Sequence, residues 1–281
     1  MKYAVEKITV NLDGAENQSF LVDFSIVRSA MSPLLIFIHG FKGFKDWGHY
    51  PLLDTFFTEK GISIARMNFS HNGVSENCLR EFSRLDLFAE NRISYELKDI
   101  QKLLEFINDN LSDSVDLSKI CLMAHSRGGL SAIAYCAQQA QIRKLITLSS
   151  VADISRMWGN YDLEKWKKEG IVYSKNARTA EEMPMKYSLV QDYLSHENLF
   201  NPLKAAKKIK IPWLALHGSE DQAVPISEWE SLKLSQPNLV SEVIRGADHT
   251  LGGKHPWTTN QLPEQCEFAM NIVADFILKN S

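Results

Sequence analysis

Apolar residues along this chain gather in short runs that alternate with longer amphipathic stretches. Two strand-like runs at the start, Ala4 to Leu12 and Phe20 to Val27, are separated by a polar segment that predicts a hairpin turn. Short continuous apolar runs then recur, and such runs are typical of strands buried on both faces of a parallel sheet. They lie at Leu34 to Ile38, Ile62 to Phe69, Lys119 to Met123, Lys144 to Leu148, Trp213 to Leu216 and Glu242 to Ile244.

Helical periodicity fills the intervals between these runs. Aliphatic residues between Ile93 and Leu111 are spaced alternately by four and three positions, which predicts a helix with one apolar face. Near the end of the chain, Pro263 opens a second helical pattern, and proline suits the first turn of a helix. Strands that alternate with helices predict an α/β fold, with a mostly parallel central sheet flanked by helices.

One segment, from Asp153 to about Lys210, lacks a run of the core-strand type and carries many aromatic residues among charged ones. We expect a largely helical insertion that can cover the strand ends as a cap. The predicted division is therefore a core domain of residues 1–152 and 211–281, with a helical cap insertion of residues 153–210. For each aromatic residue of the insertion, packing is a more frequent role than ligand contact.

Composition narrows the functional classes. The chain has 281 residues and a formal net charge of −3, with both signs interspersed and no long basic run, so a nucleic-acid or anionic-membrane surface has no electrostatic support. The start resembles no signal peptide, and no apolar run reaches transmembrane length. Four scattered cysteines without C-x-x-C spacing predict buried reduced thiols, no zinc site and a cytoplasmic location.

The stretch Ala124-His125-Ser126-Arg127-Gly128 stands between a strand-like run and a helix-like run. A serine on a sharp strand-to-helix turn is a nucleophile elbow, and small residues two positions before and after the serine allow the turn. The motif departs from G-x-S-x-G at its first position, which is Ala124 here. We interpret Ser126 as a candidate nucleophile.

A serine hydroxyl needs a base, and the base needs a group that fixes its tautomer. In a parallel sheet such groups lie in loops at the carboxyl ends of strands. His249 follows the last strand-like run and is the candidate base, with His255 as the competing one. Asp221 follows the preceding strand-like run and is the candidate acid, with Glu220 and Asp153 as alternatives.

The stretch His39-Gly40-Phe41-Lys42-Gly43 follows the run Leu34 to Ile38. The backbone N–H groups of Phe41 and of Arg127, the residue after the serine, are candidate oxyanion donors. The Arg127 side chain could contact a substrate carboxylate or pair with a nearby acid. We expect structural roles for His39 and His217, and we expect His125 to point away from the serine.

Together these motifs resemble a serine-type α/β-hydrolase over nearly the whole chain. The His-Gly-Phe loop and the small cap look most similar to the dienelactone-hydrolase-like and feruloyl/cinnamoyl-esterase-like members. The resemblance implies a catalytic Ser-Asp-His triad, no cofactor and no metal, and hydrolysis of esters, or less often of amides or thioesters. The landmarks are His39-Gly40-Phe41, the Ser126 elbow, His217-Gly218 with Asp221, Gly246-Ala247-Asp248-His249, and a weaker loop that keeps Gly73 and Ser75.

The resulting hypothesis is a cytoplasmic carboxylesterase with a small-molecule ester substrate, acting as a monomer or homodimer. A peptidase, thioesterase, perhydrolase or C–C bond hydrolase on the same fold is the first alternative. Haloalkane dehalogenases and epoxide hydrolases fit less well, because they use an aspartate where Ser126 stands. The second alternative is a non-catalytic binding protein that retains the fold.

Overall fold

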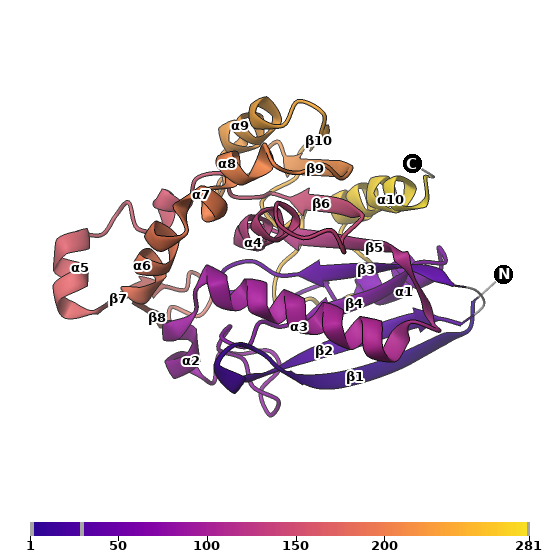
Figure 1. Cartoon of the computed structure of the whole chain (residues 1–281), viewed down its shortest axis with the longest axis horizontal. Coiled ribbons are helices and arrows are strands. Elements are labelled where there is room, and N and C mark those ends of the chain that lie inside the picture. Colours follow the sequence, from indigo (N-terminus) through magenta and orange to yellow (C-terminus); the bar gives the residue numbers. More distant parts are fainter. Residues whose placement is uncertain (1–2, 29–30, 280–281) are drawn as a thin grey trace.

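A computed structural model describes residues 3–28 and 31–279 of the chain. Its centre is an eight-stranded sheet with the strand order β1-β2-β4-β3-β5-β6-β9-β10 (Figure 1). The antiparallel β1–β2 hairpin forms one edge, and β10 forms the other. The strands β4, β3, β5, β6, β9 and β10 are mutually parallel. The strands are β1 (Val5–Asp13), β2 (Ser19–Val27), β3 (Ser32–Ile38), β4 (Ser63–Met67), β5 (Val115–His125), β6 (Lys144–Leu148), β9 (Trp213–Gly218) and β10 (Val240–Ile244).

The predicted fold class is confirmed, because each strand-like run of the sequence overlaps a strand of this sheet. The predicted helix is α3 (Ile93–Leu111), and Pro263 is the residue before α10 (Glu264–Leu278). Successive residues of a strand point to opposite faces of a sheet. In β3, Leu34 and Ile36 therefore pack in one apolar cluster, while Leu35 and Phe37 pack in another.

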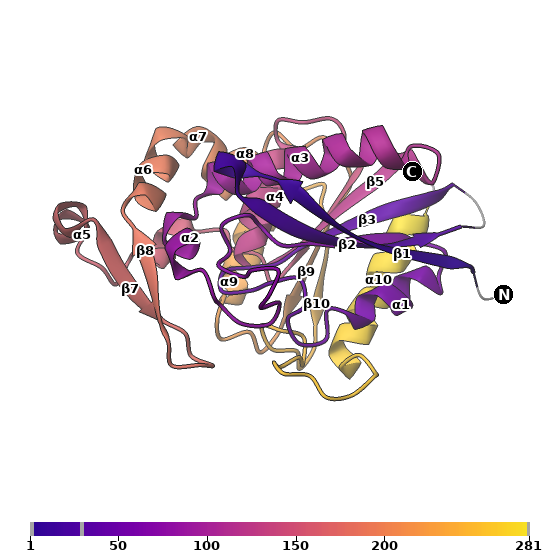
Figure 2. The same cartoon turned by 90° about the horizontal axis from the view of Figure 1, so that it is seen from below.

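Helices cover both faces of the sheet (Figure 2). On one face, α1 (Leu52–Thr58) and α10 pack on the cluster that includes Phe37. The opposite face is covered by α3, α4 (Arg127–Cys136), α8 (Pro202–Ala206) and α9 (Ile226–Ser235). This two-sided burial explains why the parallel strands are continuously apolar.

Most of the segment of residues 153–210 lies beyond the carboxyl ends of the parallel strands, toward the left of Figure 1, while its last part, α8, packs on one face of the sheet. Helices are predicted here, and the structure adds an antiparallel pair of strands that no sequence pattern indicates. Within the described part of the chain these two strands pair only with each other, so they do not need the continuous apolar sequence of a core strand. The elements of the segment before α8 are the 3-10 helix η2 (Ile154–Met157), α5 (Leu163–Glu169), β7 (Ile171–Lys175), β8 (Glu182–Lys186), α6 (Ser188–Ser195) and α7 (Glu197–Phe200).

A third apolar cluster joins this segment to the rest of the molecule. Trp158, Trp166 and Phe200 are buried in it, together with Phe88 of α2 (Leu85–Glu90). These aromatic residues serve packing. Tyr161 differs, because it also lines a cavity beside the candidate site.

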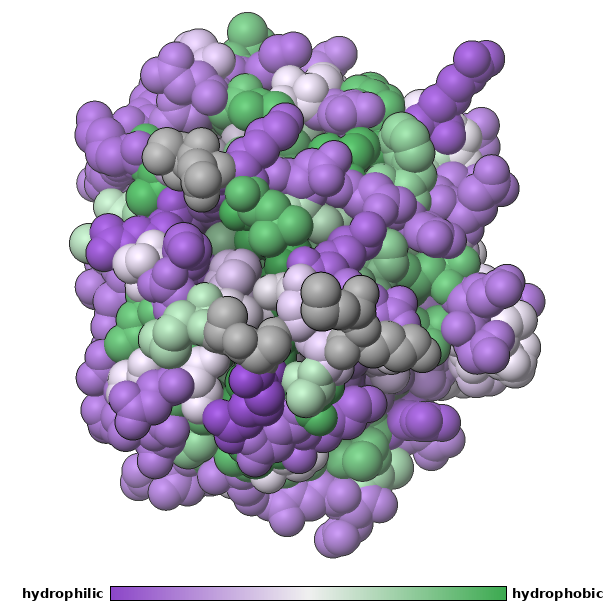
Figure 3. Space-filling model, turned by 90° about the vertical axis from the view of Figure 1, so that its right-hand side faces the viewer, coloured by the Kyte–Doolittle hydropathy of each residue, from purple (hydrophilic) through white to green (hydrophobic). Residues whose placement is uncertain are grey.

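The amino ends of the parallel strands lie on the opposite side of the molecule from this segment. Figure 3 shows this face, where polar side chains dominate and apolar ones appear in separate small groups. Within residues 3–28 and 31–279, no helix has both the length and the apolar character needed to cross a membrane.

Candidate active site

Ser126 occupies a sharp turn between β5 and α4. Its φ of 57° and ψ of −126° are unusual for a non-glycine residue and mark a strained backbone. Gly128 permits the turn, because a Cβ there would lie only 2.3 Å from the carbonyl oxygen of His39. The elbow thus packs backbone against backbone on the end of β3.

The structure brings Ser126, His249 and Asp221 into one chain of hydrogen bonds. The Ser126 Oγ lies 2.9 Å from Nε2 of His249, and Nδ1 of His249 lies 2.8 Å from Oδ2 of Asp221. An ionised carboxylate only accepts hydrogen bonds, so Nδ1 of His249 carries the proton and Nε2 is left to accept from the serine hydroxyl. The three residues come from the loops after β5, β10 and β9.

The environment of Asp221 keeps its carboxylate ionised. The Asp221 side chain is fully buried, and its Oδ1 accepts hydrogen bonds from the backbone N–H groups of Ala223 (2.9 Å) and Val224 (2.8 Å). Burial opposes ionisation, but the hydrogen bond and charge of His249 and the Val224 N–H outweigh it and lower the pKa of Asp221 to about 2. The two oxygens of Asp221 thus have separate tasks, one toward the backbone and one toward His249.

The competing candidates lie in other contacts. Glu220 is exposed, and Asp153 accepts a hydrogen bond from the backbone N–H of Ser155 at the start of η2. The Nδ1 of His255 accepts a hydrogen bond from the backbone N–H of Gly48, at 2.8 Å.

The loop after β3 passes close to the serine. A Cβ on Gly40 would lie 2.8 Å from the Ser126 Cβ and 3.4 Å from its Oγ, so only glycine leaves this space free. Phe41 follows directly and lines both cavities beside Ser126. Arg127 is the first residue of α4, so its N–H has no acceptor within the helix.

The Arg127 side chain points into a buried polar cluster that the sequence motifs alone do not indicate. Its guanidinium pairs with Glu96 of α3, whose carboxylate also accepts hydrogen bonds from Ser131 and Asn91. Of the two alternatives for Arg127, the structure shows pairing with an acid. Burial lowers the pKa of Arg127 to about 10. A sequence signal exists, because Glu96 lies three residues after Ile93 and four before Ile100, on the apolar side of the helix.

Two histidines near the site are buried and neutral. His39 donates from Nδ1 to the carbonyl oxygen of Gly40 (2.9 Å) and accepts at Nε2 from Asn72 (3.2 Å). His125 contacts the carbonyl oxygen of His249 at 2.8 Å. Burial lowers the pKa of His39 to about 4 and that of His125 to about 3. His217 contacts the carbonyl oxygen of Val224 at 2.9 Å, beside the Asp221 loop.

Two cavities flank the Ser126 hydroxyl. One, of about 340 Å³, extends toward Val151 and Tyr161, and the other, of about 310 Å³, extends toward Trp47 and Tyr50. Such volumes accommodate the two sides of a small molecule whose reacting bond lies at the serine.

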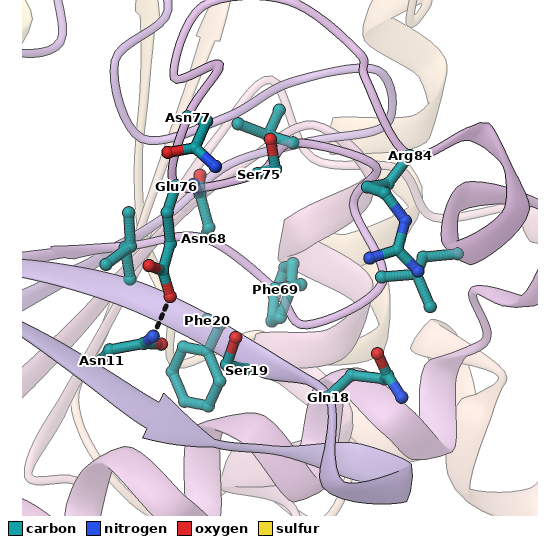
Figure 4. Close-up of a pocket in the computed structure, with 13 residues that line it drawn as sticks. Asn11, Gln18, Ser19, Phe20, Asn68, Phe69, Ser75, Glu76, Asn77 and Arg84 are labelled. Atoms are coloured by element: carbon teal, nitrogen blue, oxygen red, sulfur yellow. Dashed lines mark hydrogen bonds between the residues drawn. The ribbon is translucent and has the colours of Figure 1, made fainter.

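A separate pocket of about 220 Å³ lies between the β1–β2 hairpin and the loop that follows β4 (Figure 4). Its lining includes Asn11, hydrogen-bonded to Glu76, and Arg84, but none of the residues of the candidate site. Among the described residues, no group of three His, Cys, Asp or Glu side chains could hold a metal ion.

Comparison with known proteins gives the family. The family model described as BD-FAE matches residues 85–236, which is more than half of the chain. The chain belongs to the BD-FAE family. The matched region contains Ser126 and Asp221, while Phe41 and His249 lie outside it. No curated protein matches this BD-FAE family member in sequence.

Solved structures with the same architecture share little sequence with this BD-FAE family member. Est1E from Butyrivibrio proteoclasticus superposes with a TM-score of 0.69 at 20% identity, covering 96% of this chain and 97% of that one. The esterase domain of a Rhodothermus marinus protein gives a TM-score of 0.64 at 13% identity, covering 96% and 97%. A puromycin-hydrolyzing peptidase of Mycobacterium tuberculosis gives 0.63 at 14% identity, covering 99% of this chain and 39% of that one. The fold is that of the α/β-hydrolases, so the resemblance inferred from the sequence motifs is confirmed.

Proposed function

We propose that this chain is a serine carboxylesterase that acts through an acyl-enzyme intermediate. The observation that carries the proposal is the hydrogen-bonded series from the Ser126 hydroxyl through His249 to Asp221, with contacts of 2.9 and 2.8 Å. Family membership supports a hydrolase, and the esterases among the structural neighbours favour an ester substrate.

In the first step, the Ser126 Oγ attacks the ester carbonyl while Nε2 of His249 takes the hydroxyl proton. Asp221 holds the ring in the required tautomer and stabilises the imidazolium that forms. The carbonyl oxygen becomes an oxyanion, and the backbone N–H groups of Phe41 and Arg127 stabilise it.

Collapse of the tetrahedral intermediate breaks the bond to the alcohol oxygen. His249 returns its proton to that oxygen, and the alcohol leaves while the acyl group remains on Ser126. A water molecule then attacks the acyl carbonyl while His249 takes a proton from it. The bond between the acyl carbon and Ser126 Oγ breaks, His249 returns the proton to Oγ, and the acid is released. The overall reaction consumes one ester and one water molecule and releases one alcohol and one acid.

The cap belongs to the same proposal. Residues 153–210 contribute Arg156, Met157 and Tyr161 to one cavity beside Ser126, and the turn after β7 to the other. We infer that this segment determines which acyl and alcohol groups fit, while the core supplies the reacting groups.

The direct test is hydrolysis of short-chain 4-nitrophenyl esters by wild type and by Ser126→Ala. We expect turnover by wild type and a loss of at least about 10³-fold in the variant. Labelling by a fluorophosphonate probe tests the nucleophile separately from substrate choice. Equal turnover by both proteins, or a wild type that stays unlabelled, would contradict the proposal.

A peptidase is the second candidate, because a puromycin-hydrolyzing peptidase shares the fold. Ester and amide substrates with the same acyl group distinguish the two. For a carboxylesterase we expect the ester to be hydrolysed faster than the amide by a factor larger than the difference in leaving groups explains. For a peptidase we expect the amide to be cleaved at a rate comparable to that of the ester.

A further inference from the structure

The cavities beside Ser126 carry an unusual balance of charge. Among the residues that the structure describes, those that line the two cavities include basic side chains but no aspartate or glutamate, although the chain as a whole has a net charge of −3. The basic residues are Lys42, Arg127, Arg156, Lys175 and Arg178.

Two of these charges are already balanced. Arg127 pairs with the buried Glu96, and Arg156 pairs with Glu228. Both ion pairs lie at the cavity of about 340 Å³, so of its basic lining residues among the described residues only Lys42 has no carboxylate within 4 Å.

The other cavity, of about 310 Å³, is lined by Lys42 as well and also by Lys175 and Arg178, and we name it the Lys42 cavity. Within the part of the chain that the structure describes, no carboxylate oxygen lies within 4 Å of the Lys42, Lys175 or Arg178 side-chain nitrogens; the acids Glu182, Glu81 and Glu181 act only at longer range. Trp47 and Tyr50 supply an apolar wall in the same cavity. The combination suits a molecule with an apolar body and a negative end.

Lys42 lines the same cavity as Ser126, and two hydrogen bonds hold its ammonium in place. It follows Phe41 in the loop after β3, with a φ of 56° that is uncommon for a non-glycine residue. Its ammonium donates to the Ser174 Oγ (2.9 Å) and to the carbonyl oxygen of Lys175 (2.7 Å), both in β7. An ammonium has three N–H donors, so one remains for a ligand. Burial also lowers the pKa of Lys42, which is the expected effect on a cation without a close counter-ion.

Arg178 also lines the Lys42 cavity, and it is exposed to solvent. It lies in the turn between β7 and β8, with its guanidinium 5.9 Å from the centre of the Phe44 ring. A planar guanidinium with unpaired N–H groups binds carboxylates in two-point contacts.

We propose that the Lys42 cavity binds a carboxylate, so that the preferred substrates are esters that carry a second, ionised carboxyl group. This inference rests on the proposed ester hydrolysis and names the class of ester. The ester carbonyl would lie at Ser126, and the carboxylate would lie between the Lys42 ammonium and the Arg178 guanidinium.

Matched pairs of esters test the inference. Mono-4-nitrophenyl glutarate against 4-nitrophenyl valerate places the charge in the acyl part, and 4-acetoxybenzoate against methyl 4-acetoxybenzoate places it in the leaving group. At low salt we expect the charged member of one pair to have a kcat/KM about tenfold higher than its neutral partner. The ratio should fall as NaCl is raised, because salt screens a partly exposed charge.

Variants show whether the preference comes from this cavity. Arg178→Gln and Lys42→Met should each reduce the charged-to-neutral ratio several-fold. Lys167→Gln, which removes an exposed lysine of α5 outside the cavity, should leave the ratio as it is. A purely structural effect of Lys42→Met would lower both members of a pair together and leave the ratio unchanged.

The inference and the proposed function fail in different ways. Hydrolysis that depends on Ser126 but shows no charge preference in either pair would overturn the inference and leave the function intact. Calorimetric titration with glutarate and 4-hydroxybenzoate tests the cavity without turnover. Binding by wild type that Arg178→Gln weakens and Lys167→Gln does not would support it, and absence of both binding and preference would overturn it.

Discussion

Gly128→Ala would test how closely the elbow must approach the end of β3. The added methyl would lie 2.3 Å from the carbonyl oxygen of His39 and 3.1 Å from its carbonyl carbon. Both contacts are with backbone, so no side-chain rotation relieves them. A carbon–oxygen contact needs about 3.3 Å, and the start of α4 must therefore move away from β3 by about 1 Å.

This movement has two measurable consequences. Overpacking of this kind costs about 1–3 kcal/mol of unfolding free energy. The movement also separates the N–H of Arg127 from that of Phe41, and the proposed oxyanion donors then no longer face the same point. Loss of one such donor lowers kcat by about 10²–10³, so we expect activity to fall much more than stability.

Gly159→Ala is the matched control. Gly159 is exposed, and an added Cβ would meet only the Ser155 carbonyl oxygen at 3.4 Å, an ordinary contact. Urea denaturation and 4-nitrophenyl ester hydrolysis should be measured on both variants and on wild type. If Gly128→Ala matches Gly159→Ala in both assays, the close packing of the elbow on β3 is not required for stability or for activity.

Three further changes separate the roles of the surrounding groups. In Asp221→Asn the amide oxygen must accept the two backbone hydrogen bonds, so the NH₂ group faces His249 and forces the wrong tautomer of its ring. We expect kcat to fall by about 10⁴ with little change in KM. A loss in kcat below tenfold would contradict the orienting role of Asp221. Glu96→Gln leaves the buried Arg127 guanidinium without a counter-charge, so urea denaturation should show a loss of about 3 kcal/mol, and a variant as stable as wild type would count against the ion pair. The pKa of His39 is about 4 in the folded protein, and 6.5 is its ordinary value. Between these pH values the unfolded state therefore binds more protons than the folded state. The free energy of unfolding falls on acidification by about 1.4 kcal/mol per pH unit for each such histidine. Unfolding free energies measured at pH 7 and pH 5 should show this loss, reduced in His39→Gln; equal slopes in both proteins would refute it.

The activity itself should also fall on acidification, for a different reason. Nε2 of His249 must be unprotonated to accept the serine proton. The pKa of Asp221 is about 2, so Asp221 is not the group that titrates in the range of the assay. A kcat/KM that stays flat from pH 8 to pH 5 would argue against His249 as the base.

The periodicity of the chain predicts the sheet and its long helices well, because parallel strands buried on both faces must be continuously apolar. The elbow at Ser126 is predictable for a similar reason, since few contexts place a serine between a buried strand and a helix. Asp221 and His249 are predictable in the same way, because both lie in loops that follow neighbouring parallel strands.

Other features depend on contacts between distant segments. The β7–β8 pair is held by its own hydrogen bonds and by the cluster around Trp166, and neither strand has a distinctive sequence. The pairing of Arg127 with Glu96 joins α4 to α3, and no local pattern specifies the partner. The lack of counter-ions around Lys42 and Arg178 is likewise visible only when the fold has assembled the cavity.

The position of β10 at the edge of the sheet has a consequence for the dynamics of the enzyme. Among the residues that the structure describes, the strand before the His249 loop has a hydrogen-bonded neighbour on one side only, whereas the loop that carries Ser126 follows a central strand. Segments with fewer backbone partners open at lower free energy than central ones. Amide hydrogen exchange should therefore be faster in β10 than in β5. On heating, activity should be lost at a lower temperature than the core unfolds, because local opening of β10 moves His249 away from Ser126.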